Sequence, residues 1–186
     1  TILIYDSPSL QKKAIDIFVQ NEFEKPKKIK LEKTKNKKIK IGYYSSDFHN
    51  HATMYLMANL FELHDKTKFE TYAFSFGPDD GSKIRERVVK TFDKFFDVKL
   101  KPTEEIVKDS RELNLDIAID LKGFTNNNRF DLFIERCAPI QISYLGFPGT
   151  TGSDCMDYLI ADKIVIPEES KIHYSENIIY LPNSYQ

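Results

Sequence analysis

The sequence contains little cysteine and no long apolar run. Cys137 and Cys155 are the only cysteines among its 186 residues. They are too few and too far apart for a disulfide framework or a zinc knuckle, and their scarcity favours a reducing compartment such as the cytoplasm. No apolar run approaches the ~20 residues that a membrane-spanning helix needs, and the first residues lack the pattern of a signal peptide. The sequence therefore predicts a protein that is neither stapled by disulfides nor inserted in a membrane.

An excess of charge of one sign is also absent. The formal net charge is −1, with 30% charged and 41% hydrophobic residues. This balance is typical of one soluble globular domain and predicts no nucleic-acid or membrane partner. The lysine-rich run 27–40 is the exception. Because like charges repel, the run favours a solvated linker, and binding to an acidic partner is the alternative.

Several catalytic signatures are missing as well. The sequence has no P-loop and no GxGxxG dinucleotide fingerprint, which disfavours a nucleotide-sugar epimerase. It has no GxSxG elbow of a serine hydrolase, and no paired carboxylates spaced as in a glycosidase. None of these motifs therefore identifies the function.

Short apolar strands alternate with helical stretches along most of the chain. The predicted strands are 39–44, 69–76, 95–98, 116–121, 140–145, 158–161 and 178–181. The predicted helices are 8–24, 54–63, 83–92, 103–113 and a short one within 126–136. Ser82 is the expected N-cap of the helix 83–92, and Thr103 is expected to open the helix 103–113. This alternation predicts an α/β fold, a Rossmann-like parallel sheet with helices on both faces. We expect an amphipathic helix and linker over 1–37 and the Rossmann-like lobe over 38–186.

Polar residues follow three of the predicted strands. Because the carboxyl ends of parallel strands meet at one edge of the sheet, the loops 45–53, 122–129 and 146–154 should lie together there and form a ligand site. Their polar side chains are Asp47, His49, His51, Lys122, Thr125, Asn126, Arg129, Thr150, Thr151 and Asp154.

His51 stands directly before a predicted helix, where an imidazole can bond a ligand or handle a proton near neutral pH. The alternatives are a loop histidine bonded to backbone, or a metal site with Asp47 and His49. No further Cys/His cluster offers more ligands, so we predict no metal. The segment LGFPGTTG, 145–152, can bring free N–H groups close to ligand oxygens, or it can be a plain turn.

Five segments together resemble the O-linked N-acetylglucosamine transferase and SPINDLY family. They occur in the family's order and are IGYYSSDFHNHAT, FGPDDGS, DLKGFTNNNR, APIQISYLGFPGTTGSDCMDYLIAD and YSENIIYLPNSYQ. The resemblance covers roughly 38–186 and implies the amino-terminal lobe of the catalytic region of a two-lobed GT-B glycosyltransferase. Tetratricopeptide repeats upstream and a donor-binding lobe downstream are implied with it.

The resemblance also implies roles for particular residues. His51 matches the family's catalytic histidine in the SSDFxxH motif. Leu145, Gly146 and Pro148 match the loop that lines the sugar pocket, and Phe124 and Thr125 match the turn beside it. His49 is not a shared position, and Ala52 replaces a proline common in the family.

The implied reaction is inverting transfer of a sugar, most simply N-acetylglucosamine from UDP-GlcNAc, to a Ser/Thr hydroxyl of a protein or peptide acceptor. It uses no cofactor, because the nucleotide-sugar donor is a co-substrate, and no metal. Without its second lobe this chain should be inactive. The alternative is a non-catalytic binding or scaffold module that retains the lobe.

Overall fold

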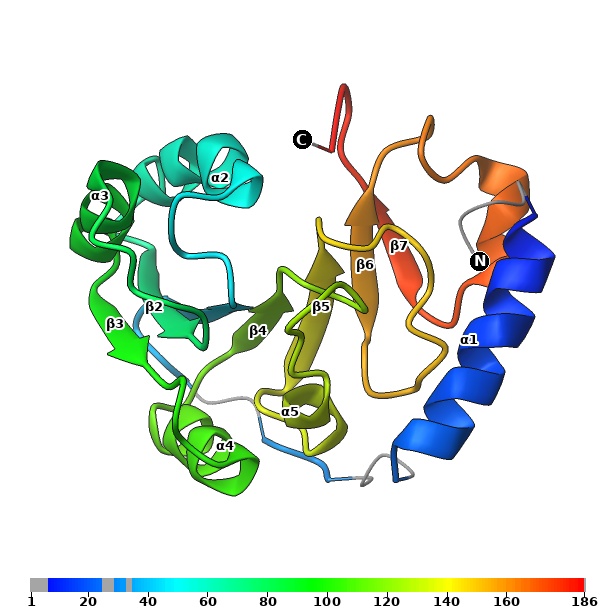
Figure 1. Ribbon diagram of the computed structural model, residues 1–186, viewed down its shortest axis with the longest axis horizontal. Coiled ribbons are helices and arrows are strands. Elements are labelled where there is room, and N and C mark those ends of the chain that lie inside the picture. The colour runs from blue at the N-terminus through cyan, green and yellow to red at the C-terminus, as the bar shows by residue number, and fades with distance from the viewer. Residues whose placement is uncertain (1–6, 25–28, 33–34, 186) are drawn as a thin grey trace.

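The computed structural model describes residues 7–24, 29–32 and 35–185, and within them seven parallel strands form one sheet. The strands are β1 (Ile39–Ser45), β2 (Phe69–Ser75), β3 (Lys94–Asp97), β4 (Ile117–Asp120), β5 (Ile140–Tyr144), β6 (Tyr158–Ala161) and β7 (Asn177–Tyr180). Their order across the sheet is β3-β2-β1-β4-β5-β6-β7 (Figure 1). The predicted Rossmann-like parallel sheet is confirmed.

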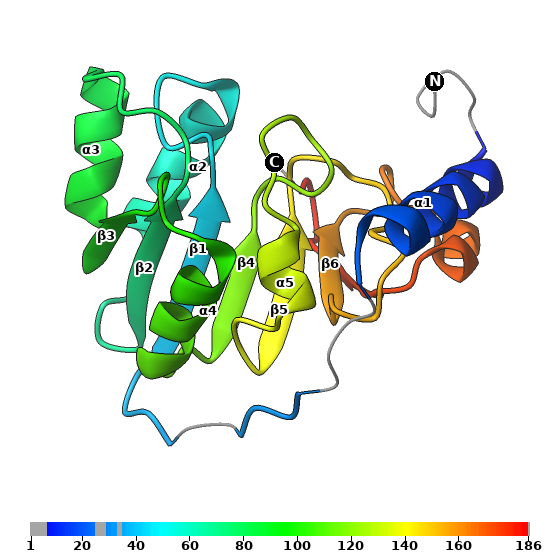
Figure 2. The same ribbon diagram turned by 60° about the horizontal axis from the view of Figure 1, so that its bottom comes forward.

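Helices cover both faces of the sheet. They are α1 (Pro8–Glu22), α2 (Ala52–Glu62), α3 (Lys83–Thr91), α4 (Thr103–Glu112), α5 (Asp131–Ile134) and the short 3₁₀ helix η2 (Glu168–His173). Figure 2 shows α4, α5 and α1 in front of the sheet, with α2 and α3 behind it. For α2 to α5 this separation follows from right-handed crossovers between parallel strands, whereas α1 precedes the first strand.

Alternating strand side chains build a separate hydrophobic core on each face. In β1, Tyr43 packs with α2 and α3, whereas the next residue, Tyr44, packs with α4 and α5. Tyr44 also stacks on Phe74 of β2, with ring centroids 4.5 Å apart. Both faces of the central strands are therefore buried, as expected for a parallel sheet.

The first helix packs against the lobe on the α4/α5 side. Phe18 and Phe23 contact the ring of Phe124, at centroid distances of 5.3 and 6.3 Å, and Phe23 also contacts Phe130 at 5.4 Å. Ile15 lies so close to Gly152 that a Cβ there would approach it to 2.7 Å. The proposed division of the chain at residue 37 stays a prediction, and the linker residues 27, 28, 33 and 34 lie outside the described residues.

Local signals predicted the starts of α1, α3 and α4, including the start of α4 at Thr103. The Ser82 hydroxyl accepts a hydrogen bond from the Arg85 N–H and caps α3 as predicted. The residue before α4 is Pro102, which provides no side-chain cap, and the Thr103 hydroxyl donates to Asp131. The helix η2 was not predicted.

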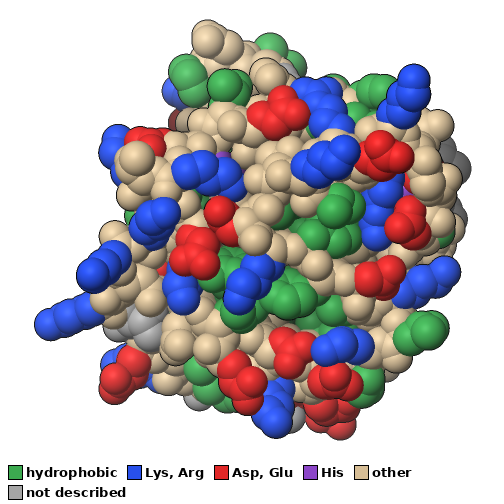
Figure 3. Space-filling model, turned by 90° about the vertical axis from the view of Figure 1, so that its left-hand side faces the viewer, with side chains coloured by type: hydrophobic (Ala, Val, Ile, Leu, Met, Phe, Trp, Pro, Cys, Tyr) green, Lys and Arg blue, Asp and Glu red, His purple; other side chains and the backbone are tan. Residues whose placement is uncertain are grey.

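The surface agrees with the balanced composition. On the face at the β3 edge, basic and acidic side chains are interspersed around a central group of hydrophobic ones (Figure 3). None of the described helices is both long enough and apolar enough to cross a bilayer.

Candidate functional site

The strand order reverses between β1 and β4. From β1 the chain moves outward to β2 and β3, then crosses back to β4 on the other side of β1. Ligands of open α/β sheets bind outside the carboxyl ends of the strands at such a switch point. The loops after β1 and β4 carry Asp47, His51 and Lys122, which places these three predicted polar residues at the switch point.

A buried ion pair joins the two loops. Lys122 Nζ lies 2.7 Å from Asp47 Oδ2, and the two side chains are only 6% and 9% exposed. Asp47 Oδ1 accepts a second hydrogen bond, 3.1 Å long, from the Ser46 hydroxyl. Because a buried carboxylate needs a partner to stay charged, the lysine and the aspartate hold each other in place.

His51 lies next to this pair at the start of α2. Its imidazole is the N-cap of the helix: Nδ1 accepts the backbone N–H of Thr53 at 3.2 Å. The same nitrogen is 3.6 Å from Asp47 Oδ2, and the ring is 43% exposed. The His49 ring stands edge-on to it, with centroids 5.7 Å apart. The imidazole is thus fixed on one side and open to solvent on the other.

Hydrogen bonds from α3 and from the loop before it hold the segment 48–50, which precedes this histidine. Asp80 accepts the Asn50 N–H at 2.9 Å, and Arg85 donates to the Phe48 carbonyl at 2.8 Å. The Asn50 N–H is the main cause that lowers the pKa of Asp80 to about 2. A Cβ on Gly77 would come within 1.7 Å of the Ser46 carbonyl oxygen, so the loop after β2 fits here only with glycine.

The turn after β4 is held by Asp120. Its carboxyl oxygens accept the N–H groups of Lys122 and Gly123 at 2.9 and 3.0 Å. Complete burial raises the pKa of Asp120 to about 7, against the lowering effect of these bonds. The Thr125 hydroxyl donates to the Lys122 carbonyl at 2.9 Å and closes the turn. Asp120 was not among the predicted site residues, although a carboxylate ending an apolar strand was a signal for it.

The glycine-rich loop meets this turn only with its first part. Leu145 and Gly146 both have positive φ, 58° and 57°. A Cβ on Gly146 would lie 2.4 Å from the Lys122 carbonyl oxygen, so the two loops touch there. Pro148 is half-buried, and its carbonyl accepts a hydrogen bond from Tyr174 at 3.3 Å.

The later part of that loop turns away from the predicted site. Thr150 and Thr151 are buried against Glu176, which accepts both hydroxyls and the Thr151 N–H. Asp154 is exposed, close in sequence to Asp157, whose N–H bonds the Gln141 carbonyl near the start of β5. The expectation that Thr150, Thr151 and Asp154 converge with the other loops is therefore wrong, because this connection contains no helix and runs back along the sheet.

Two further predicted residues also point elsewhere. Arg129 donates to the Lys101 carbonyl and the Thr103 hydroxyl at the start of α4. Phe124 directs its ring into the aromatic contacts with α1 described above. Asn126 is exposed in the turn. The roles proposed for His51, Phe124 and the other site residues stay predictions.

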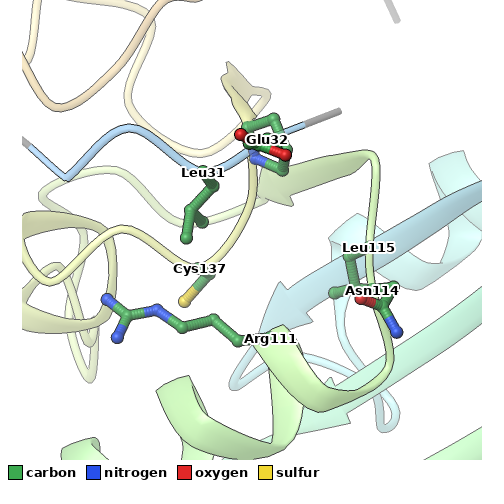
Figure 4. A pocket seen from close by; sticks show the side chains of 7 residues that line it. Leu31, Glu32, Arg111, Asn114, Leu115 and Cys137 are labelled. Carbon is green, nitrogen blue, oxygen red and sulfur yellow. The ribbon is translucent and has the colours of Figure 1, made fainter. Parts of the chain in front are cut away.

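No group of three or more His, Cys, Asp or Glu side chains within the described residues is arranged to hold a metal ion. A hollow of about 240 Å³ lies near the amino ends of β4 and β5, lined by Leu31, Arg111 and Cys137 among others (Figure 4). Burial raises the pKa of the Cys137 thiol to about 12, so it is no nucleophile at neutral pH. This hollow therefore offers no reactive group.

The fold is a Rossmann-like α/β lobe, a class in which ligands bind at the carboxyl edge of the sheet, where the switch-point residues lie. The chain matches glycosyl transferase family 41 over residues 7–186. It belongs to this family.

Three relatives illustrate the similarity. The chain is 37% identical over 149 residues to the probable UDP-N-acetylglucosamine–peptide N-acetylglucosaminyltransferase SEC of Arabidopsis thaliana, covering 80% of this chain and 15% of that protein. It is 32% identical to the Caenorhabditis elegans UDP-N-acetylglucosamine–peptide N-acetylglucosaminyltransferase, covering 80% and 13%. The structure of a mutant O-GlcNAc transferase of Thermobaculum terrenum superposes with a TM-score of 0.89 and 26% identity, covering 98% of this chain and 35% of that chain. The chain thus spans about a seventh of the length of these two curated relatives.

Proposed function

We propose that this chain is the amino-terminal lobe of a protein O-GlcNAc transferase. Together with a second lobe it transfers N-acetylglucosamine from UDP-GlcNAc to Ser/Thr hydroxyls of a protein or peptide acceptor, with inversion. The donor is a co-substrate, and neither a cofactor nor a metal takes part. The protein works in the cytoplasm, with tetratricopeptide repeats before this lobe and the donor-binding lobe after it.

The observation that carries the proposal is the contact between three loops at the switch point. Asp47 binds Lys122, His51 lies 3.6 Å from the same carboxylate oxygen, and Gly146 rests on the Lys122 backbone. A transferase must hold acceptor oxygen, anomeric carbon and leaving phosphate in line. A rigid wall with one exposed imidazole suits the acceptor side of such a cleft, and the names of the relatives supply the chemistry.

The test is sugar transfer by the full-length protein that carries this chain. Purified protein is incubated with UDP-GlcNAc and an acceptor peptide, and the mass increase of the peptide is followed. We expect transfer by the wild type and a fall of about 10²–10³-fold in kcat/KM for His51→Ala, in the range seen when one oriented polar group is removed from an active site. A matched control is His173→Ala at the end of η2, which should keep its activity.

The same assay separates the enzyme from a scaffold module. A scaffold would bind peptide without modifying it, so absence of transfer by folded wild-type protein would contradict the proposal. The isolated 186-residue chain should bind UDP-GlcNAc weakly or not at all, because we assign most donor contacts to the second lobe. Micromolar affinity in a calorimetric titration would contradict that assignment.

A further inference from the structure

The imidazole of His51 has two nitrogens with different surroundings. Nδ1 faces the first turn of α2 and the Asp47 carboxylate, whereas Nε2 has no hydrogen-bond partner among the described residues, in a side chain that is 43% exposed. In a neutral imidazole one nitrogen donates and the other accepts, and the partner of one fixes the role of the other. The contacts of Nδ1 therefore determine whether Nε2 of the exposed ring donates or accepts a hydrogen bond.

The backbone of α2 requires an acceptor at Nδ1. The first N–H groups of a helix have no partner inside the helix. Those of Met54 and Tyr55 bond the backbone carbonyl of His51, at 3.0 and 3.4 Å. The N–H of Thr53 bonds Nδ1 at 3.2 Å, and a backbone N–H can only donate. A proton on Nδ1 would face this N–H and leave it without an acceptor.

The Asp47 carboxylate does not compete for a proton on Nδ1. Its Oδ2 takes the Lys122 ammonium at 2.7 Å, and its Oδ1 takes the Ser46 hydroxyl at 3.1 Å. The separation of 3.6 Å between Oδ2 and Nδ1 exceeds a hydrogen bond. The Thr53 hydroxyl lies 3.1 Å from Nδ1 and can either donate or accept there, so this contact does not oppose an unprotonated Nδ1.

From this geometry we infer that neutral His51 carries its proton on Nε2 and acts in the cleft as a hydrogen-bond donor, not as a proton acceptor. Its ligand is an oxygen with a free lone pair, such as a hydroxyl, amide carbonyl or phosphate oxygen of a bound substrate. Thr53 is the positioning residue, because its N–H selects the tautomer. The use of this donor in sugar transfer rests on the proposed function, whereas the tautomer itself does not.

The tautomer can be measured directly in the 186-residue chain. Long-range ¹H–¹⁵N correlation spectra of the ¹⁵N-labelled chain, at a pH where the ring is neutral, distinguish a protonated from an unprotonated ring nitrogen. The His51 signals are identified by their loss in His51→Gln. We expect Nε2 to be the protonated nitrogen. A protonated Nδ1, or two averaged signals, overturns the inference whatever the protein catalyses.

Two variants of the full-length protein test the roles of Nδ1 and Nε2 separately. The amide of His51→Asn can replace Nδ1 as the helix cap but does not reach the position of Nε2, whereas the amide of His51→Gln can donate from that position but cannot take up a proton. We expect His51→Gln to keep kcat/KM within about tenfold of the wild type, and His51→Asn to lose about 10²–10³-fold, as for other lost active-site donors.

The outcomes are distinct. If His51→Gln falls as far as His51→Ala while its circular dichroism stays that of the wild type, His51 takes up a proton and the inference is overturned. If the folded wild type transfers no sugar, the proposed function fails, and the spectra still decide the tautomer.

Discussion

Removing the charge of Lys122 tests the buried ion pair that joins the loops after β1 and β4. The variant Lys122→Met keeps most of the side-chain length but removes the ammonium group that lies 2.7 Å from Asp47 Oδ2. Because both side chains are more than nine-tenths buried, the carboxylate loses its partner without gaining water. Breaking a buried pair in this way costs about 3–5 kcal/mol. That is a large part of the ~5–15 kcal/mol that stabilise a typical domain.

The assay is urea unfolding of the 186-residue chain, followed by far-UV circular dichroism. The control is Lys108→Met, because Lys108 and Glu112 form a long pair, 3.8 Å, with side chains 72% and 66% exposed. An exposed pair of this kind contributes less than about 0.5 kcal/mol. We therefore expect the two lysine variants to differ by several-fold in their loss of stability.

A double-mutant cycle identifies the cause of the loss. In Asp47→Asn/Lys122→Met neither charge is left unpaired, so the double variant should lose less stability than the sum of the two single variants. The difference should be about 0.5–3 kcal/mol, as for other side chains in contact. If Lys122→Met is as stable as Lys108→Met, or the two single effects simply add, the reasoning about this pair is refuted.

Three further changes test the surroundings of the site. Burial raises the pKa of Asp120 to about 7, against 3.8 for the ordinary carboxyl. Stability of the wild type relative to Asp120→Asn should therefore fall as the pH rises from about 4 to about 7, by up to about 4 kcal/mol at 1.36 kcal/mol per pH unit. Gly77→Ala should destabilise by more than ~1–3 kcal/mol, because its Cβ would collide with the Ser46 carbonyl. Phe124→Ala should release α1 and speed its limited proteolysis, because its ring contacts Phe18 and Phe23 there.

Each of these three changes has its own control or contradicting result. For Asp120→Asn, the prediction concerns only the part of the stability difference that changes with pH. A stability difference that stays constant with pH would show that burial does not perturb the ionisation of this carboxyl. Gly81→Ala meets no atom within 4 Å, so its effect is limited to the strain of a φ of +62°, and an equal loss for Gly77→Ala would refute the steric argument. Unchanged proteolysis of α1 in Phe124→Ala would show that other contacts hold the helix.

The sequence predicted the strands well because each is a short apolar run bounded by turn residues. The strand 39–44 and the helix 83–92 with its Ser82 cap match β1 and α3 within one residue. Such elements are determined by residues that are close in sequence, so local sequence patterns predict them. The parallel arrangement of the strands followed from the alternation of strands and helices, whereas the strand order and its switch point come from the structure.

Long-range contacts could not be predicted in the same way. Lys122 is buried, although lysines in loops are usually solvated, because its partner Asp47 lies in the loop after β1, 75 residues earlier. Thr150 and Thr151 turn away from the site because Glu176 supplies their acceptor. Nothing in the neighbouring sequence marks these pairings. The site was thus predictable as a group of loops, but its internal contacts were not.

The packing of α1 has a consequence for biosynthesis. This helix ends at Glu22 but contacts the lobe near Phe124 and Gly152. At ~5–20 residues per second, the last of these contacts leaves the ribosome on the order of ten seconds after the helix. During this time the side chain of Ile15, which is buried in the folded chain, lacks its neighbour Gly152. Within this chain α1 therefore reaches its final packing only after most of the lobe has been synthesised.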